Sequence, residues 1–252
     1  MQKPVLVLGS TGRVGRALRA HWPKSVPVLW QTRTPSLDAE TICWDILTGA
    51  PPALPPLAGV VGLAGVTAGP DLAQNSTLAL AAANLNVPVL LASTQAVYGA
   101  PIGAVSETSP VAPVTDYGRA KLDMERAVAG YGHVTCLRLA NVIGCDGLAA
   151  AMQGGGDVAL DQFPDGQGPL RMMISPQALA DVICALLAQT DPLPPVMNVA
   201  QPGFVSMQAI LTAAGATWHW RLAPASALAA LEMDVSLLQR YVPDLGPWRE
   251  TT

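Results

Sequence analysis

The chain opens, after four residues, with Val5-Leu6-Val7-Leu8-Gly9-Ser10-Thr11-Gly12-Arg13-Val14-Gly15. The apolar run ends at the first glycine, and apolar residues then recur at helical spacing as Val14, Ala17 and Leu18. This pattern predicts a buried strand, a tight turn and a helix to about residue 20. The three glycines let the backbone turn sharply and let the helix approach the strand and an anion closely. Because the amides at a helix start face an anion, the stretch predicts a site for a dinucleotide pyrophosphate.

Composition narrows the class of protein. The chain has 252 residues, a length that predicts one large globular domain, or one such domain and a second of about half the size. Its residues are 50% hydrophobic and 13% charged, with a formal charge of −4. No apolar run reaches the ~18 residues of a membrane span, and the start of the chain does not resemble a signal peptide, so we expect a soluble, cytoplasmic protein. The absence of a Lys/Arg run argues against nucleic-acid binding. Four cysteines without Cys-x-x-Cys spacing indicate reduced core thiols and no metal site.

Strands and helices are expected to alternate along the first half of the chain. Apolar runs predict further strands at 26–30, 41–44, 60–64 and 88–92, and a helix at 71–85. Such alternation predicts an α/β fold built on a doubly wound parallel sheet of the Rossmann type. Ligands of such sheets bind at the carboxyl ends of the strands. Ala64 and Gly65, which end the fourth strand, are therefore candidate cofactor contacts.

The residues after the second expected strand indicate the cofactor. An acid there would bind the ribose 2′-hydroxyl of NAD, but the chain has Gln31, Thr32 and Arg33. Arg33, with Arg13, could instead pair with the 2′-phosphate of NADP, because a guanidinium binds phosphate bidentately. We therefore prefer NADP, with NAD as the alternative. The competing interpretation is that Arg33 is an ordinary solvated side chain in a loop and binds no phosphate.

A tyrosine and a lysine one helical turn apart are the candidate catalytic pair. Ser93 and Thr94 follow the fifth strand. A helix starting near Asp116, its expected N-cap, carries Tyr117 and Lys121 on one face. A lysine cation and an oxidised nicotinamide would favour the phenolate, so Tyr117 could exchange a proton with a substrate oxygen while hydride moves to or from the same carbon. Thr94 would hold that oxygen. The alternative is an ordinary packed helix pair.

With these motifs, the chain resembles an extended short-chain dehydrogenase/reductase of the NAD-dependent epimerase/dehydratase family. The resemblance covers nearly the whole chain. Gly9, Gly12 and Gly15 match the family's cofactor turn, with Thr11, Arg13 and Val14 inside it. The resemblance implies further roles: adenine contact for Asp45 and Ile46, catalysis for Thr94, Tyr117 and Lys121, and substrate binding for Ser93, Asn141 and Arg171.

Departures from the family pattern limit the reaction. Gln95 and Ala96 stand where dehydratases carry acids, which argues against dehydration. Arg171 falls on the position that binds the diphosphate in sugar-nucleotide epimerases, although a surface ion pair would also explain it. The second part of the chain is short for a nucleotide-sugar enzyme.

We expect two regions. Residues 1–145 would form the dinucleotide-binding domain, and residues 146–252 would complete the sheet and form a small substrate-binding lid. Within the latter we expect a strand at Asn198-Val199, a helix from Ser206 to Leu211, packing by Trp218-His219-Trp220, and an Ala/Leu-rich helix from about Pro224 to Met233.

The favoured hypothesis is an NAD(P)-dependent oxidoreductase that reduces a carbonyl, or oxidises an alcohol, of a small molecule. Two alternatives stay open: an NAD-dependent epimerase of a nucleotide sugar, and a non-catalytic NADP sensor or assembly subunit. The apolar helices expected at 71–85 and 116–129 could pair in a homodimer. The sequence does not identify the substrate.

Overall fold

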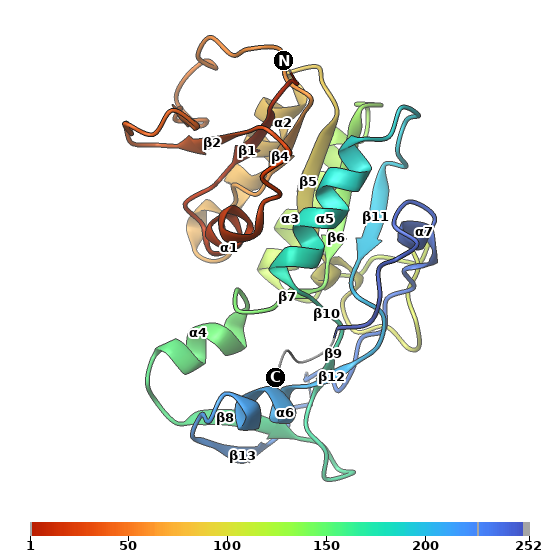
Figure 1. The fold of residues 1–252 in the computed structure, drawn as a ribbon. Helices are drawn as coiled ribbons and strands as arrows, with labels where there is room; N and C mark the ends of the chain where they lie inside the picture. Colours follow the sequence, from red (N-terminus) through yellow and green to blue (C-terminus); the bar gives the residue numbers. More distant parts are fainter. Residues whose placement is uncertain (1, 226, 249–252) are drawn as a thin grey trace.

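A seven-stranded parallel sheet forms the centre of the molecule (Figure 1). The computed structural model describes residues 2–225 and 227–248. The sheet order is β11-β6-β5-β4-β1-β2-β3. Its strands are β1 (Val5–Leu8), β2 (Val28–Thr32), β3 (Thr41–Cys43), β4 (Gly59–Gly62), β5 (Val89–Thr94), β6 (Val134–Leu139) and β11 (Val196–Val199). The predicted Rossmann-type doubly wound fold is confirmed.

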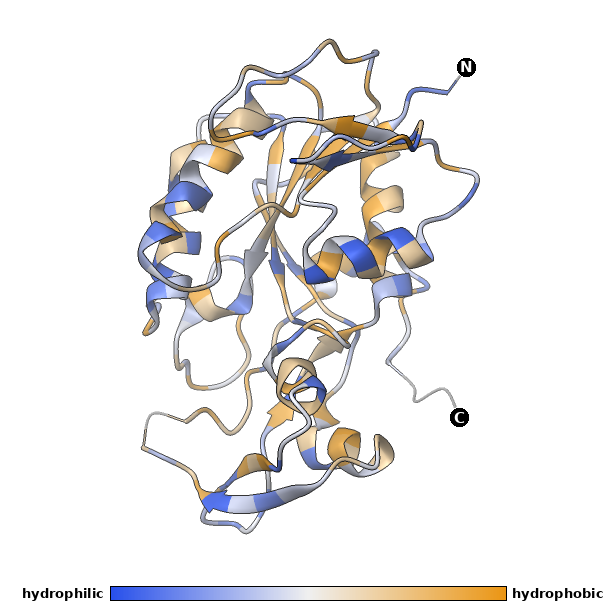
Figure 2. Cartoon of the chain, turned by 90° about the vertical axis from the view of Figure 1, so that its left-hand side faces the viewer, coloured by the Kyte–Doolittle hydropathy of each residue, from blue (hydrophilic) through white to orange (hydrophobic). Residues whose placement is uncertain are grey.

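Helices cover both faces of this sheet, and the alternation of β1 shows why. Val5 and Val7 belong to the apolar cluster that contains Leu18 of α1 (Arg13–His21) and Ile183 of α5 (Pro176–Leu187). Leu6 and Leu8, which point to the opposite face, belong to the cluster under α2 (Gln74–Ala83) and α3 (Asp116–Val128). Figure 2 shows apolar strands enclosed by helices whose polar residues face outward. Burial on both faces is what a parallel sheet requires.

A smaller lobe lies below the carboxyl ends of the strands (Figure 1). It contains α4 (Gly147–Gln153), the parallel pair β8 (Val158–Gln162) and β13 (Trp218–Leu222), the antiparallel pair β9 (Leu170–Arg171) and β12 (Val205–Ser206), and α6 (Met207–Ala213). Its small core is formed by Val158, Leu160, Met207 and Leu211, and Trp218 and Trp220 pack against it. The two indole rings lie edge to face, with their centres 4.9 Å apart.

The remaining elements are short. They are η1 (Pro70–Ala73), η2 (Gln95–Tyr98), the parallel pair β7 (Asn141–Val142) and β10 (Met173–Ile174), and α7 (Ser236–Gln239).

The expectation of a helix from about Pro224 to Met233 is wrong. The described residues of this segment form no helix, and from Leu231 to Val235 buried and exposed residues alternate strictly. Such alternation is the period of extended chain. Met233 forms a parallel bridge with Val105, and its amide donates to the sulfur of Met172. Burial of every second side chain therefore outweighs the helix propensity of the Ala/Leu-rich composition.

Three smaller expectations need correction. The second strand extends to Thr32, so Gln31 lies within it rather than after it. The N-cap of α3 is Thr115, whose hydroxyl accepts from the Gly118 amide, and Asp116 is the first helical residue. Cys43 is exposed on the edge strand β3 instead of lying in the core, whereas Cys136 and Cys145 are buried.

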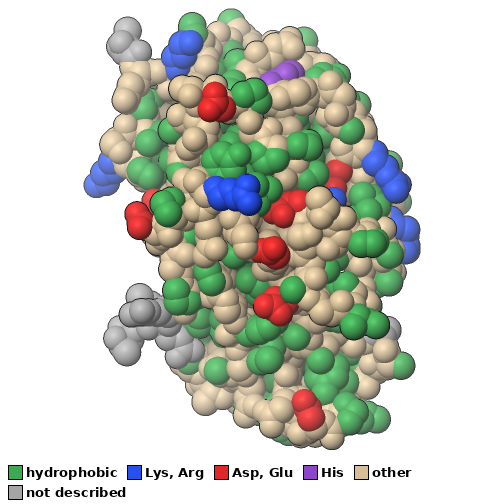
Figure 3. Space-filling model, turned by 90° about the vertical axis from the view of Figure 1, so that its right-hand side faces the viewer, with side chains coloured by type: hydrophobic (Ala, Val, Ile, Leu, Met, Phe, Trp, Pro, Cys, Tyr) green, Lys and Arg blue, Asp and Glu red, His purple; other side chains and the backbone are tan. Residues whose placement is uncertain are grey.

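Charged side chains are sparse on the surface. On the face drawn in Figure 3, the Lys and Arg side chains are scattered, and some of them lie beside Asp or Glu. Among the described residues, no helix combines the length and apolar character needed to cross a bilayer.

Gly15 fixes the distance between α1 and the turn before it, which predicts a stability difference. A Cβ at Gly15 would lie 2.4 Å from the Gly9 carbonyl oxygen, whereas one at Gly12 would lie 3.3 Å from the same atom. We expect Gly15→Ala to lower the free energy of unfolding by about 1–3 kcal/mol, because backbone has to move. Gly12→Ala is the matched control and should cost less in urea denaturation. Equal losses would contradict this account of the turn.

Candidate active site

The glycine turn after β1 leaves a helix N-terminus open toward the carboxyl end of the sheet. Gly9 has φ of 82°, and a Cβ there would lie 2.4 Å from the Ala64 amide nitrogen. Gly12 caps α1 without a side-chain hydrogen bond, and the first turn of α1 contains no acid. Its amides are therefore free for an anion from outside the helix. This is the geometry that the sequence predicts for a pyrophosphate.

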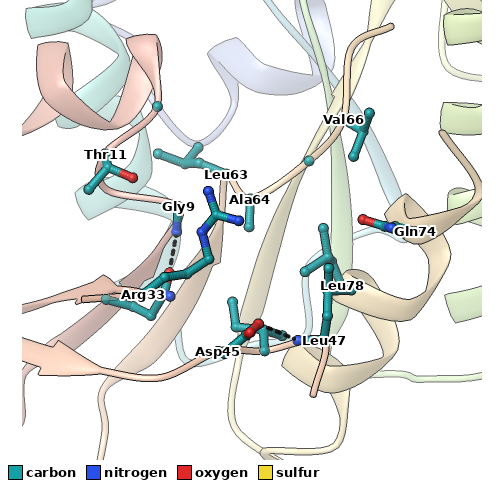
Figure 4. A pocket seen from close by; sticks show the side chains of 14 residues that line it. Gly9, Thr11, Arg33, Asp45, Leu47, Leu63, Ala64, Val66, Gln74 and Leu78 are labelled. Carbon is teal, nitrogen blue, oxygen red and sulfur yellow. Dashed lines mark hydrogen bonds between the residues drawn. The ribbon is translucent and has the colours of Figure 1, made fainter. Parts of the chain in front are cut away.

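Two hollows meet at this turn and share Gly9, Gly12, Leu63 and Gly65 in their walls. The first, of about 290 Å³, lies over the ends of β2 and β3, and the second, of about 480 Å³, lies over the ends of β5 and β6. Figure 4 shows the first hollow. Every residue predicted to bind the cofactor lines one of the two: Thr11, Arg33, Asp45, Ile46 and Ala64 the first, Arg13, Val14 and Gly15 the second, and Gly9, Gly12 and Gly65 both. Together the hollows fit a long, two-ended ligand such as a dinucleotide.

Gln31 occupies the place where an acid would contact a ribose. Its Oε1 accepts from the Gly9 amide at 2.8 Å, and its Nε2 donates to the Trp44 carbonyl at 2.6 Å. The side chain is buried, and the Ser10 hydroxyl donates to its backbone carbonyl. Gln31 therefore braces the glycine turn against β3. Sequence reasoning treated it as a missing acid and did not predict this structural role.

Arg33 and Asp45, which follow the neighbouring strands β2 and β3, both line the first hollow (Figure 4). The Arg33 side chain extends into the space between the glycine turn and Asp45. The Asp45 carboxylate accepts from the Leu47 amide and so stabilises its own turn. The Arg33 guanidinium has no hydrogen-bond partner among residues 2–225 and 227–248. The Arg33 guanidinium is therefore available to bind a phosphate group of a ligand in this hollow.

The three predicted catalytic residues line the second hollow. Thr94 ends β5, and its hydroxyl caps η2 by accepting from the Ala96 amide at 3.2 Å. Tyr117 and Lys121 lie one turn apart on α3 and line the same hollow as Thr94. A phenol beside a hydroxyl at the end of a strand can hold and protonate one substrate oxygen.

Burial sets the protonation of this pair. It raises the pKa of Tyr117, and the neighbouring Thr94 side chain lowers that pKa only in part. Burial also lowers the pKa of Lys121 to about 8, against smaller raising effects of Cys136 and Glu125. The Lys121 ammonium donates to the Ala92 carbonyl at 2.7 Å. The expected lowering of the Tyr117 pKa by Lys121 is therefore not seen, and the phenol keeps its proton.

The predicted substrate-binding residues have different surroundings. Asn141 lines the second hollow and accepts from Gln95 Nε2 at 2.8 Å. Ser93 also lines it, but its hydroxyl is buried and donates to Glu125. Arg171 lines neither hollow, and its guanidinium donates to the carbonyls of Leu170 and Ala229.

Asp146 is a wall residue that sequence reasoning missed. It caps α4 by accepting from the Ala149 amide, and its other oxygen accepts from Asn141 at 3.1 Å. Arg13 donates across the cleft to the Asp146 carbonyl at 3.0 Å. An aspartate immediately before a helical stretch is an N-cap signal, so its local role was predictable, but the contact to Arg13 spans 133 residues.

A profile of the NAD dependent epimerase/dehydratase family matches residues 66–154. This match confirms the predicted resemblance and the expectation of an enzyme. No curated protein matches the chain in a sequence comparison.

Solved structures share the fold at low identity. MoeE5 in complex with UDP-glucuronic acid and NAD is 20% identical with a TM-score of 0.76, over 98% of this chain and 94% of that chain. UDP-glucuronic acid 4-epimerase from Bacillus cereus, in complex with UDP-glucuronic acid and NAD, is 18% identical with a TM-score of 0.75, over 98% and 95%. TunA, an NAD-dependent NDP-hexosamine 5,6-dehydratase, is 19% identical with a TM-score of 0.72, over 100% and 93%. At this identity the likeness shows the fold.

The low pKa of Lys121 predicts a pH-dependent stability. Folding lowers this pKa from 10.5 to about 8, so the folded state binds fewer protons between these values and the lysine's contribution to the unfolding free energy rises with pH there. Between pH 7 and 10.5, the wild type should gain about 3 kcal/mol relative to Lys121→Met. Urea denaturation of both proteins across this range measures the difference. Parallel pH curves would show that Lys121 keeps its ordinary pKa.

Proposed function

We propose that this chain, whose residues 66–154 match the NAD dependent epimerase/dehydratase family, is an NAD(P)-dependent oxidoreductase that acts on a carbonyl or alcohol of a small molecule. The observation that carries the proposal is the placement of Thr94, Tyr117 and Lys121 in one hollow that adjoins the glycine turn. This arrangement can hold a substrate oxygen beside the nicotinamide end of a dinucleotide.

The protonation of Tyr117 favours the reductive direction. When bound, the reduced cofactor supplies hydride to the carbonyl carbon. Tyr117 gives its proton to the carbonyl oxygen, and Thr94 holds that oxygen through its hydroxyl. Because burial raises the Tyr117 pKa, the phenol carries the proton that this step consumes. The Lys121 ammonium, buried beneath the same hollow, places a positive charge next to the cofactor site.

NADP is the cofactor that we propose, with NAD as the alternative. Gln31 presents no carboxylate and both ends of its amide are engaged, so it offers no acceptor to a ribose hydroxyl. Arg33 extends into the same hollow and can pair with a 2′-phosphate. The NAD seen in MoeE5 and in the Bacillus cereus epimerase favours the alternative.

Epimerisation of a nucleotide sugar is the second candidate. It is supported by the UDP-glucuronic acid bound in two structures of the same fold. Against it, Arg171 is engaged with two carbonyls outside both hollows. A UDP-glucuronic acid incubation followed by NMR of the sugar separates the two activities, because an epimerase produces the C4 epimer without net consumption of cofactor.

The Tyr117→Phe variant tests the chemistry. We expect turnover of a panel of small aldehydes and ketones to fall at least about 100-fold, because the proton donor is lost, while cofactor affinity changes no more than a few-fold. Cofactor oxidation measured by absorbance gives the rate. Tyr131→Phe, which alters a tyrosine bonded to Asn84 at the surface, is the matched control. Full turnover by Tyr117→Phe would refute the mechanism, and cofactor binding without any turnover in the wild type would favour the non-catalytic sensor.

The Arg33→Ala variant tests the cofactor. After a check of the purified protein for retained cofactor, calorimetric titration with NADPH, NADH, NADP and NAD should show that the wild type prefers the phosphorylated forms. Arg33→Ala should weaken NADPH about tenfold or more, because one charge-assisted phosphate contact is lost, and leave NADH nearly unchanged. Arg126→Ala, on the exposed face of α3, is the control. Equal weakening of NADPH and NADH would assign Arg33 no role in discrimination.

A further inference from the structure

Three polar side chains are bonded in a row beside the second hollow. Gln95, the residue after Thr94, donates from Nε2 to Asn141 Oδ1 at 2.8 Å. Asn141 donates from Nδ2 to Asp146 Oδ2 at 3.1 Å. The row connects three separate elements, because Gln95 begins η2, Asn141 begins β7 and Asp146 caps α4. Neither Gln95 nor Asp146 has a part in the proposed reaction.

Asp146 sets the direction of this row. Its carboxylate accepts hydrogen bonds and cannot donate them. Oδ1 accepts from the Ala149 amide at 3.0 Å, and Oδ2 accepts from Asn141. The Asn141 amide must therefore turn Nδ2 toward Asp146 and Oδ1 toward Gln95, and Gln95 must in turn offer Nε2. Arg13 holds the backbone of Asp146 by donating to its carbonyl at 3.0 Å.

The direction leaves one oxygen of the row without a donor. Gln95 Oε1 is buried and has no hydrogen-bond partner in the described part of the chain. An unsatisfied buried acceptor is unfavourable. Reversal of both amides would give this oxygen a donor, but it would place Asn141 Oδ1 against the Asp146 carboxylate. The unpaired Gln95 oxygen thus follows from the direction that Asp146 imposes.

The end of Asn141 that faces the second hollow is its nitrogen. Asn141 and Asp146 both line this hollow, whereas Gln95 lines neither hollow. The Asn141 oxygen is therefore on the side away from the cleft. Nδ2 has two hydrogens, and within residues 2–225 and 227–248 Asp146 is the acceptor for one of them. The second is available to an acceptor of a ligand beside Thr94 and Tyr117, which line the same hollow.

We propose that Gln95 and Asp146 are positioning residues that impose one direction on the Asn141 amide, so that the second hollow presents a hydrogen-bond donor to the substrate. The proposal rests on the proposed function for the use of this donor, but not for the direction of the row. Such a donor selects a substrate with a second acceptor oxygen near the reacting carbonyl, as in a dicarbonyl compound. A hydroxyl at the same place would fit either direction, because it can donate or accept.

Urea denaturation at about pH 8, where a glutamate is ionised, tests the direction without any substrate. Gln95→Glu places an acceptor against Asn141 Oδ1, so the unfolding equilibrium constant should rise about tenfold or more. Asp146→Asn should change this constant little, because asparagine caps a helix as well as aspartate does. Gln95→Glu/Asp146→Asn should restore the wild-type value, because the whole row can then run in the opposite direction with the same net charge.

A second glutamine and aspartate provide the matched control. Gln177 donates to Asp181 at 3.1 Å on the exposed side of α5. Gln177→Glu and Gln177→Glu/Asp181→Asn should each change the unfolding constant by about twofold at most. Equal stability of Gln95→Glu and the wild type, or no rescue by Asp146→Asn, would overturn the proposal. Should Gln95→Glu not fold, recovery of the folded protein by the second substitution is the expected rescue.

Kinetics with two ketones test the use of the donor. Diacetyl has two carbonyl oxygens, and acetoin has a hydroxyl in place of one of them. In Gln95→Glu/Asp146→Asn the Asn141 amide turns its oxygen to the hollow, so KM for diacetyl should rise about tenfold relative to KM for acetoin, with little change in kcat. An unchanged ratio of the two KM values, in a variant as stable as the wild type, would overturn the role toward substrate.

Failure of the proposed function gives a different result. Full turnover by Tyr117→Phe would refute the chemistry while the ratio of KM values still reports the Asn141 amide. If the wild type reduces neither ketone, the urea measurements alone decide whether Gln95 and Asp146 impose the direction.

Discussion

The whole structure depends on a contact that only backbone can make. The turn after β1 lies against the start of the loop after β4 and against α1 at distances that leave no room for a Cβ at Gly9 or Gly15. This approach sets α1 over one face of the sheet and directs its free amides at the carboxyl edge. Gln31 then fixes the turn from the side by accepting from the Gly9 amide and donating to the Trp44 carbonyl. Three strands are thereby aligned at the point where the two hollows meet.

The second half of the site is organised by charge rather than by close backbone contact. Lys121 and Glu125 join α3 to β5 through polar bonds in a region where apolar packing would suffice for stability. Polar bonds have direction, which apolar contacts lack, so they define how the helix is rotated about its axis. Tyr117, one turn before Lys121 on the same face of α3, is therefore placed relative to Thr94 by bonds made one and two positions earlier in β5.

Local patterns in the sequence predicted the parts of the site that depend on neighbours in the chain. The glycine turn and the Tyr117–Lys121 pair follow from spacing within one turn or one helix, and the structure brings them to one cleft. The end of β2 could not be found in this way, because its pairing with β3 extends the strand to Thr32 and turns Gln31 inward. The extended conformation of residues 231–235 was not predicted for the same reason, because it depends on the bridge between Met233 and Val105, which is distant in the sequence. Glu125 of α3 and Arg138 of β6 are 13 residues apart in the chain and meet between the helix and the sheet, and nothing in either local sequence indicates the pair.

The C-terminal segment has a consequence for synthesis of the protein in the cell. β11 is an edge of the central sheet, and Asn198 within it donates to the carbonyls of both Val105 and Asp234. β11 is thus translated after all the other strands of the sheet. Asp234, which Asn198 connects to Val105 in the loop after η2, is translated later still. β6 therefore emerges from the ribosome before the strand that covers its outer edge. Completion of the seven-stranded sheet is a late event, because it requires Val196–Val199.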